Sequence, residues 1–251
     1  MPEDDSLGID REFIVKMAQM PILALLWVAA AFLSHKIWAA FSPVGLNGGP
    51  LVVLAFGMIL AAFIDGWALK VPNWVTLPLV LSGWMLGLLH DCGVAVDGGT
   101  GGIAVSIWCT FIGFFLLFPM LAIRGVGEGD VKMQMGFGAW VVAYFGAGAT
   151  TRAVDLADLW GWEVTLWGFM YGALVGGAFG LIIIFIRRQW GANARIYAGI
   201  AKDLTDFAQG NVSEATKRAE ERRNVWVKLP YGIPLCVGFL LYLGQKLILE
   251  A

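Results

Sequence analysis

Long apolar runs alternate with short polar segments along almost the whole chain. A helix that crosses a bilayer needs about 20 predominantly apolar residues, and membrane helices tolerate the Gly and Pro found inside several runs. The pattern therefore predicts an all-α fold, a polytopic bundle of transmembrane helices. The expected spans are residues 18–41, 51–69, 74–90, 103–123, 133–149, 165–186 and 230–248.

The same pattern predicts how the chain is organised. Residues 1–17 are an acidic lead-in, which does not fit a secretory signal because such a signal begins with a basic region. Residues 18–41, although interrupted by Ser34-His35-Lys36, predict an extra N-terminal span, and residues 51–248 predict a six-span core.

Within that core, residues 187–228 form the one long polar segment. Ile196, Ile200, Leu204 and Phe207 repeat there at helical spacing. This spacing predicts an amphipathic helix lying on the inner membrane surface.

Lys and Arg predict the orientation, because they are concentrated in cytoplasmic loops. With the N-terminus in the cytoplasm, every Lys and Arg except Lys36, Arg152 and Lys246 falls on the cytoplasmic side. We therefore expect an integral protein of the cytoplasmic (inner) membrane with a cytoplasmic N-terminus.

Composition agrees with a lipid environment. The chain is 59% hydrophobic and only 14% charged, whereas soluble proteins are about 25% charged. The net charge of -2 and the lack of a basic stripe give no indication of nucleic-acid binding. The lipid bilayer is the partner that this composition predicts.

Several hydrolase classes lack their usual motifs. The three cysteines never form C-x-x-C, and no H-E-x-x-H or G-x-S-x-G sequence occurs. We therefore expect no metal and no cofactor.

Two aspartates stand out at the ends of predicted spans. Asp65 lies in the last turns of the second span and Asp130 just before the fifth, so the predicted orientation puts both at the cytoplasmic face. An Asp at the centre of a membrane helix costs about 2.5–3.5 kcal/mol, which makes such residues candidates for function. Two adjacent carboxyl groups can share a proton and activate water for hydrolysis.

Simpler interpretations exist for each aspartate. Asp65 could reach the membrane interface beside Lys70, and Asp130 could be the N-cap of the fifth span. The alternating glycines at 125, 127 and 129 favour a functional role, because they leave backbone amides open to an extended substrate.

The motifs resemble those of the type IV prepilin peptidases, a family of membrane aspartyl proteases. G-E-G-D-V-K at 127–132 is similar to the family's G-x-G-D-x-K, and Asp65 is followed by a basic turn and Pro-Asn-Trp at 72–74. Residues 228–234, K-L-P-Y-G-I-P, resemble the family segment that begins the last span. The resemblance covers residues 51–248.

The resemblance implies roles for particular residues. Asp65 and Asp130 would be catalytic, and other residues would shape the site or bind substrate. Those residues are Gly127, Gly129, Lys132, Pro72, Asn73, Pro230, Tyr231 and Gly232. From its position alone, Asn73 is also explained as the N-cap of the third span.

The implied reaction is removal of a short basic leader from a prepilin-like precursor, whether pilin, pseudopilin or archaellin, at the cytoplasmic face. Larger bacterial members carry paired C-x-x-C motifs in a methylating domain, and this chain has none. The resemblance is therefore to the short, peptidase-only form, for which neither S-adenosylmethionine nor zinc is expected.

Two other functions remain open. Presenilin-like and signal-peptide-peptidase-like proteases also use a G-x-G-D aspartate, but their partner aspartate follows Tyr, whereas Asp65 follows Ile64. A proton-coupled transporter subunit would use the two aspartates as a relay. That function would need polar residues in mid-span to continue the path, and we expect none.

Overall fold

The computed structural model describes residues 11–42, 47–94, 102–122, 126–145, 162–187, 198–203, 205, 206, 209, 217, 218 and 231–250. Within these ranges every regular element is a helix, so the predicted all-α fold is confirmed. The principal helices are α1 (Arg11–Phe41), α2 (Gly49–Ala68), α3 (Asn73–Asp91), α4 (Ile103–Ala122), α5 (Glu128–Phe145), α6 (Trp162–Arg187) and α9 (Gly232–Glu250).

Each principal helix covers one of the predicted apolar runs. In the described part of the chain, four segments are long and apolar enough to cross a membrane, namely Met17–Phe41, Gly49–Ala68, Ile103–Ala122 and Trp162–Ile182. The protein is therefore an integral membrane protein. Helices α3, α5 and α9 are not among these four, so their crossing of the bilayer stays a prediction.

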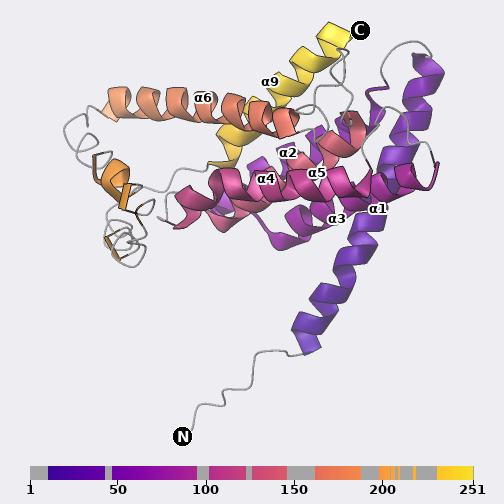
Figure 1. Cartoon of the computed structure of the whole chain (residues 1–251), viewed down its shortest axis with the longest axis horizontal. Coiled ribbons are helices and arrows are strands. Elements are labelled where there is room, and N and C mark those ends of the chain that lie inside the picture. The colour runs from indigo at the N-terminus through magenta and orange to yellow at the C-terminus, as the bar shows by residue number, and fades with distance from the viewer. Residues whose placement is uncertain are drawn as a thin grey trace, which may run out of the picture.

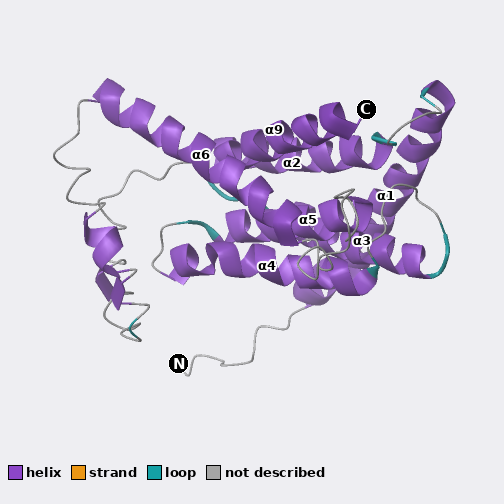
Figure 2. Ribbon diagram, turned by 45° about the horizontal axis from the view of Figure 1, so that its top comes forward, coloured by secondary structure: helices purple, strands orange, loops and turns teal. Residues whose placement is uncertain are grey.

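Helix α5 lies at the centre of the bundle. It packs against α2, α3, α4, α6 and α9, and these helices run side by side in Figures 1 and 2. Helix α1 packs against α2 and α3 and crosses the other helices at a steep angle. Because α1 begins at Arg11, residues 11–17 belong to it, while residues 1–10 of the predicted lead-in lie outside the described residues.

Large aromatic side chains from several helices fill the core around α5. The rings of Phe137 and Phe239 stack with centroids 4.1 Å apart. Trp140 is fully buried, and its indole N–H donates to the Leu79 carbonyl at 2.7 Å and to Ser82 Oγ at 2.8 Å. A buried Trp needs such a partner, so these bonds fix the register of α5 against α3.

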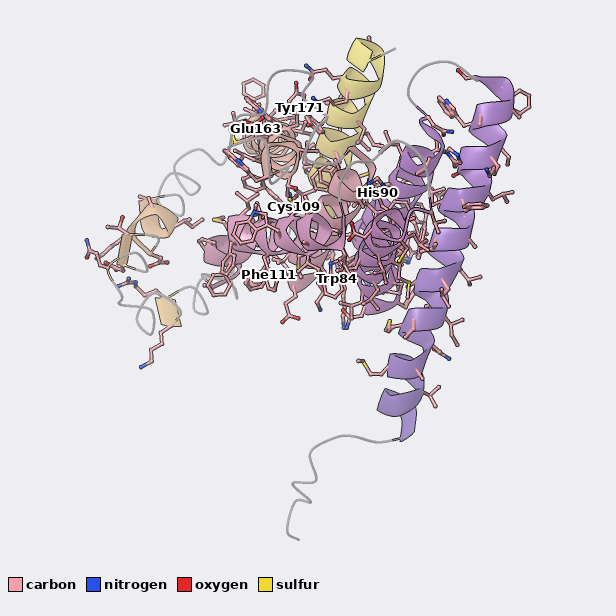
Figure 3. The ribbon with its side chains drawn as sticks, turned by 45° about the vertical axis from the view of Figure 1, so that its right-hand side comes forward. Trp84, His90, Cys109, Phe111, Glu163 and Tyr171 are labelled. Carbon is pink, nitrogen blue, oxygen red and sulfur yellow. The ribbon has the colours of Figure 1, made fainter. Side chains whose placement is uncertain are left out.

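The interior also contains polar side chains, so the expectation of none in mid-span is wrong. Gln134 is buried one turn beyond Asp130, and its Nε2 donates to the Thr165 carbonyl at 3.2 Å. Trp84 donates to Thr110 Oγ1 at 3.0 Å beside the buried Cys109, and Figure 3 labels Trp84 and Cys109. Most of these polar groups bond to backbone or to one another, as the interior of a membrane bundle requires.

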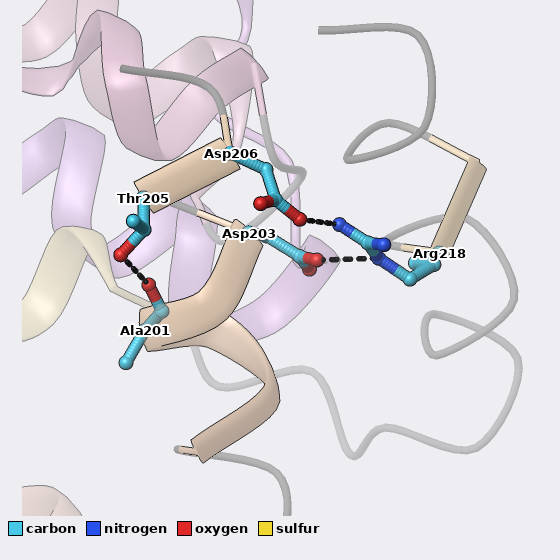
Figure 4. A network of polar contacts seen from close by, with 5 residues as sticks. All are labelled: Ala201, Asp203, Thr205, Asp206 and Arg218. Carbon is cyan, nitrogen blue, oxygen red and sulfur yellow. Dashed lines mark hydrogen bonds and ion pairs between the residues drawn. The ribbon is translucent and has the colours of Figure 1, made fainter. Parts of the chain in front are cut away.

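Parts of the predicted amphipathic segment are described. Residues 198–203 are helical and Ile200 is buried, whereas Ile196, Leu204 and Phe207 lie outside the described residues. Arg218 donates to Asp203 at 2.9 Å and also pairs with Asp206 (Figure 4). The short helix at residues 198–203 lies beyond the C-terminal end of α6 in Figure 1.

Candidate active site

Asp65 occupies the last turn of α2. The helix ends at Leu69, which adopts a left-handed conformation with φ 51° and donates its N–H to the Asp65 carbonyl at 2.8 Å. A left-handed residue commonly ends a helix in this way, although glycine is the usual choice. The early end of α2 leaves the Asp65 side chain beside the start of α9.

The Asp65 carboxylate is buried and accepts a hydrogen bond from the Gly232 backbone N–H at 2.9 Å. Gly232 is the first residue of α9, where the helix dipole favours a negative charge. A Cβ on Gly232 would lie 2.8 Å from Asp65 Oδ2, so only glycine allows this approach. Because Asp65 is buried, the interpretation that it reaches the interface beside Lys70 is wrong.

Asp130 is the third residue of α5 and is also buried. Its Oδ2 accepts the Gly127 backbone N–H at 3.0 Å, which is how a third-position side chain caps a helix from within its first turn. The N-cap interpretation of Asp130 is therefore wrong by three positions. Its other oxygen, Oδ1, is buried and has no hydrogen-bond partner among the described residues.

The two carboxyl groups converge at one end of the bundle. Asp65 and Asp130 are close enough to interact electrostatically, and Tyr231 interacts with Asp130 in the same way. Tyr231 directly precedes Gly232, so α2, α5 and the start of α9 all contribute to one cluster. Where two carboxyl groups lie in contact they can share one proton, which allows one to act as an acid while the other acts as a base.

The segment between α2 and α3 packs against the start of α5. Lys132 Nζ donates to Asn73 Oδ1 at 2.8 Å and lies 3.9 Å from Glu128. Pro72 precedes α3 in an extended conformation and occupies the N-cap position. The predicted N-cap role of Asn73 is therefore wrong, because its side chain bonds to Lys132 across the site.

The site glycines differ in what surrounds them. A Cβ on Gly129 would lie 2.7 Å from the Val71 Cβ, so this glycine allows α5 to pack closely against the segment between α2 and α3. Gly127 is exposed beside Asp130 and keeps an open face. Gly125 and Pro230 lie outside the described residues.

Comparison with known proteins gives the family. A model of the type IV leader peptidase family matches residues 52–181, more than half of the chain. The chain belongs to the type IV leader peptidase family. The family match includes both aspartates, whereas Tyr231 and Gly232 lie beyond it.

Curated relatives of this type IV leader peptidase family member carry the name prepilin leader peptidase/N-methyltransferase. The protein from Aeromonas salmonicida (strain A449) is 29% identical over 177 residues, which cover 68% of this chain and 51% of the relative. The protein from Aeromonas hydrophila gives the same identity and coverage. The protein from Burkholderia pseudomallei (strain 1026b) is 28% identical over 173 residues, which cover 66% of this chain and 46% of the relative.

The chain thus spans about half the length of the curated relatives that it matches. No solved structure matches it significantly. In the described part of this leader peptidase family member, no three His, Cys, Asp or Glu side chains gather in a group that could hold a metal ion.

Sequence reasoning missed two residues that position the site. Leu69 ends α2 in a conformation that is normally reserved for glycine, and no sequence signal indicates it. Val71 fills the space above Gly129, a contact that depends on how α5 packs against the segment after α2. Leu69 could not be predicted because a left-handed conformation normally requires glycine, and Val71 could not be predicted because its contact with Gly129 depends on tertiary packing.

Proposed function

We propose that this protein is a membrane-embedded aspartic endopeptidase that removes the leader from prepilin-like precursors. The observation that carries the proposal is the convergence of two buried carboxyl groups, Asp65 and Asp130, from different helices. The family match and the names of the relatives support leader cleavage as the reaction. They also favour this reading over the presenilin-like and transporter alternatives.

In the proposed mechanism, one aspartate is protonated and the other ionised. The ionised carboxylate takes a proton from water, whose oxygen attacks the scissile carbonyl carbon, while the protonated partner donates to the carbonyl oxygen. The C–N bond then breaks as the leaving amine takes up the proton that was removed from water. The hydroxyl formed from the carbonyl oxygen returns its proton to the partner aspartate, which leaves a carboxylic acid and restores the starting pair. The unpartnered Oδ1 of Asp130 is suited to contact the water or the peptide.

Backbone hydrogen bonds hold both Asp65 and Asp130 in place. Asp65 is held by the Gly232 N–H, and Asp130 is held by the Gly127 N–H through one oxygen only. Both carboxyl groups are therefore fixed before a substrate arrives, which favours catalysis by orientation. Lys132 would hold the α2–α3 segment through Asn73, next to Pro72, and Tyr231 and Gly232 would form the part of the site at the start of α9.

We place the reaction at the cytoplasmic surface of the inner membrane. Trp67 and Trp74 are exposed at the end of the bundle where Asp65 lies, and Trp residues are enriched at membrane interfaces. The substrate's basic leader would lie in the cytoplasm while its apolar helix stays in the bilayer. A pilin, a pseudopilin and an archaellin precursor would all meet these requirements.

The test is cleavage of a prepilin-like precursor by membranes that contain wild type, Asp65→Asn or Asp130→Asn. Asparagine keeps the size of aspartate but neither ionises nor shares a proton. We expect each variant to lose at least about 10³-fold in kcat/KM, the scale on which general acid–base groups act. Normal cleavage by both variants would refute the proposal.

Asp91→Asn is the matched control. Asp91 lies at the other end of α3, where its Oδ2 accepts the Ile103 N–H at 2.9 Å. An asparagine oxygen can still accept that bond, so Asp91→Asn should cleave like wild type. Loss of activity in this control would mean that any such substitution damages the bundle.

A further inference from the structure

A groove with a volume of about 460 Å³ runs between α2 and α9. Its lining is apolar on both sides. On α2, Ile59, Phe63, Gly66 and Trp67 recur at helical spacing and so form one stripe, and Ile233 and Val237 line it from α9.

The groove borders the aspartate cluster. Gly66 directly follows Asp65, and Ile233 directly follows Gly232, whose N–H binds Asp65. Ile59 lies six residues before Asp65, so the groove reaches about 9 Å along α2 from the carboxylate at the helical rise per residue. One end of the groove therefore lies next to the site, and the rest extends along α2.

Within the described residues, helices pack against other sides of the two helices that carry the aspartates. Helix α5, which carries Asp130, is surrounded by α2, α3, α4, α6 and α9, and α1 packs on another side of α2. In Figure 2, α2 and α9 lie next to each other at one edge of the bundle. Among the described residues, the α2–α9 groove thus offers a path along which an element in the bilayer can reach Asp65 from the side.

We propose that the α2–α9 groove receives the apolar helix of the precursor whose leader is cleaved. This inference rests on the proposed function and specifies where the substrate lies. A precursor held at Asp65 must continue from its extended cleavage site into the bilayer, and the groove begins at that point. Ala62 and Gly66 let a second helix approach closely, as small residues do in membrane bundles. Phe63 and Trp67, which are 71% and 87% exposed, flank that helix.

Disulfide cross-linking tests the position of the substrate directly. Ile59→Cys and Val237→Cys are made in a Cys236→Ala background, because Cys236 also lines the groove. A precursor with single cysteines along its apolar helix is co-expressed and the membranes are oxidised. Leu174→Cys, on the lipid-facing side of α6 and 69% exposed, is the control.

We expect cross-links from both groove positions to the precursor and none from Leu174→Cys. Cross-links at Leu174 as strong as those in the groove would overturn the proposal. So would groove positions that link only two copies of this chain, or that link to nothing because lipid fills the groove.

Kinetics give an independent test. Ile59→Trp and Val237→Trp add bulk at half-exposed positions that can accept a larger side chain without disturbing the core. We expect KM for the full-length precursor to rise about tenfold, equivalent to about 1.4 kcal/mol of binding free energy, with kcat little changed. Leu174→Trp should leave both parameters unchanged.

If wild type cleaves and the aspartate variants are inactive, an unchanged KM in both groove variants would overturn the groove proposal and leave the proposed function standing. If wild type itself does not cleave, the proposed function fails first, so the two failures can be told apart. Thermal unfolding of each variant in detergent shows whether a loss of activity comes from misfolding.

Discussion

At the scale of single residues, the site depends on how closely backbone can approach the Asp65 carboxylate. The Gly232 N–H lies 2.9 Å from Asp65 Oδ2, and an added Cβ would lie 2.8 Å from the same oxygen. Any side chain at residue 232 would therefore force Asp65 or the start of α9 to shift. The position of the carboxylate and the identity of residue 232 are linked.

Gly232→Ala should therefore lower the activity strongly, although it adds only one methyl group. The methyl group would push Asp65 away and lengthen its hydrogen bond, and a displacement of about 1 Å can cost about 100-fold in rate. We expect that loss in kcat/KM for precursor cleavage. Gly244→Ala in the same helix, where a Cβ would meet nothing within 4 Å, should behave like wild type. Full activity in Gly232→Ala would show that the contact does not position Asp65.

The Lys132–Asn73 bond gives a second prediction at this scale. The bond joins α5 to the start of α3 at 2.8 Å and involves a charged donor that is 27% exposed. Lys132→Met and Asn73→Ala should each lower kcat/KM, and the double variant should be little worse than either alone. A double-mutant cycle should give a coupling free energy of about 0.5–1.5 kcal/mol. Additive losses would mean that the two residues act separately.

Sequence reasoning succeeded and failed at the residue scale for identifiable reasons. Asp65 and Asp130 could be singled out because a carboxylate at a membrane span is costly wherever it points. Their partners could not be derived from the pattern, since Asp65 and Gly232 are 167 residues apart. Asn73 was assigned a local role as N-cap, but Pro72 takes that position and a residue from α5 binds the Asn73 side chain.

At the scale of elements, glycine pairs set the spacing between helices. A Cβ on Gly238 of α9 would lie 2.2 Å from the Gly172 backbone nitrogen of α6. Small residues at such crossings let membrane helices pack through their backbones. Because α9 also carries Gly232, its contact with α6 determines where the start of α9 meets Asp65.

Gly238→Ala should consequently destabilise the protein. Forcing α9 and α6 apart costs about 1–3 kcal/mol by overpacking, so the thermal unfolding midpoint in detergent should fall. Gly177→Ala in α6 is the matched control, because a Cβ there meets nothing within 4 Å. Its only effect should be the gain in helix propensity, up to about 1 kcal/mol. Equal midpoints for the two variants would contradict close packing at Gly238.

The helices themselves were predictable, because the length of an apolar run is a local property of the sequence. Each of the seven expected spans corresponds to one helix. The polar interior was not foreseen. Gln134 is buried in the short, moderately apolar run of α5, and the bond from its Nε2 to the Thr165 carbonyl depends on the packing of α6. Helix α5 can carry such a residue because other helices shield it from lipid on most sides.

At the scale of the whole molecule, function depends on which side of the membrane the aspartate cluster faces. The end of α2, the start of α3, the start of α5 and the start of α9 all meet at this cluster. Their loops carry the Lys and Arg that predict a cytoplasmic location. A leader peptidase working on this side would meet precursors before their leaders could leave the cytoplasm.

The two ends of α3 allow this orientation to be measured. Lys70 is exposed just before the helix, and Cys92 is exposed and unpaired just after it. The intervening 19 residues span about 28 Å, close to the thickness of the hydrocarbon core. A membrane-impermeant maleimide should label Cys92 in intact cells, because the predicted orientation puts this end of α3 outside. The label should be specific for Cys92, because the other two cysteines are buried. In a Cys92→Ser background, Lys70→Cys should be labelled only after the membrane is permeabilised. The reverse labelling pattern would put Asp65 and Asp130 on the outer side, where a cytoplasmic leader could not reach them. The proposed substrate would then have to be abandoned, even if the aspartates are catalytic.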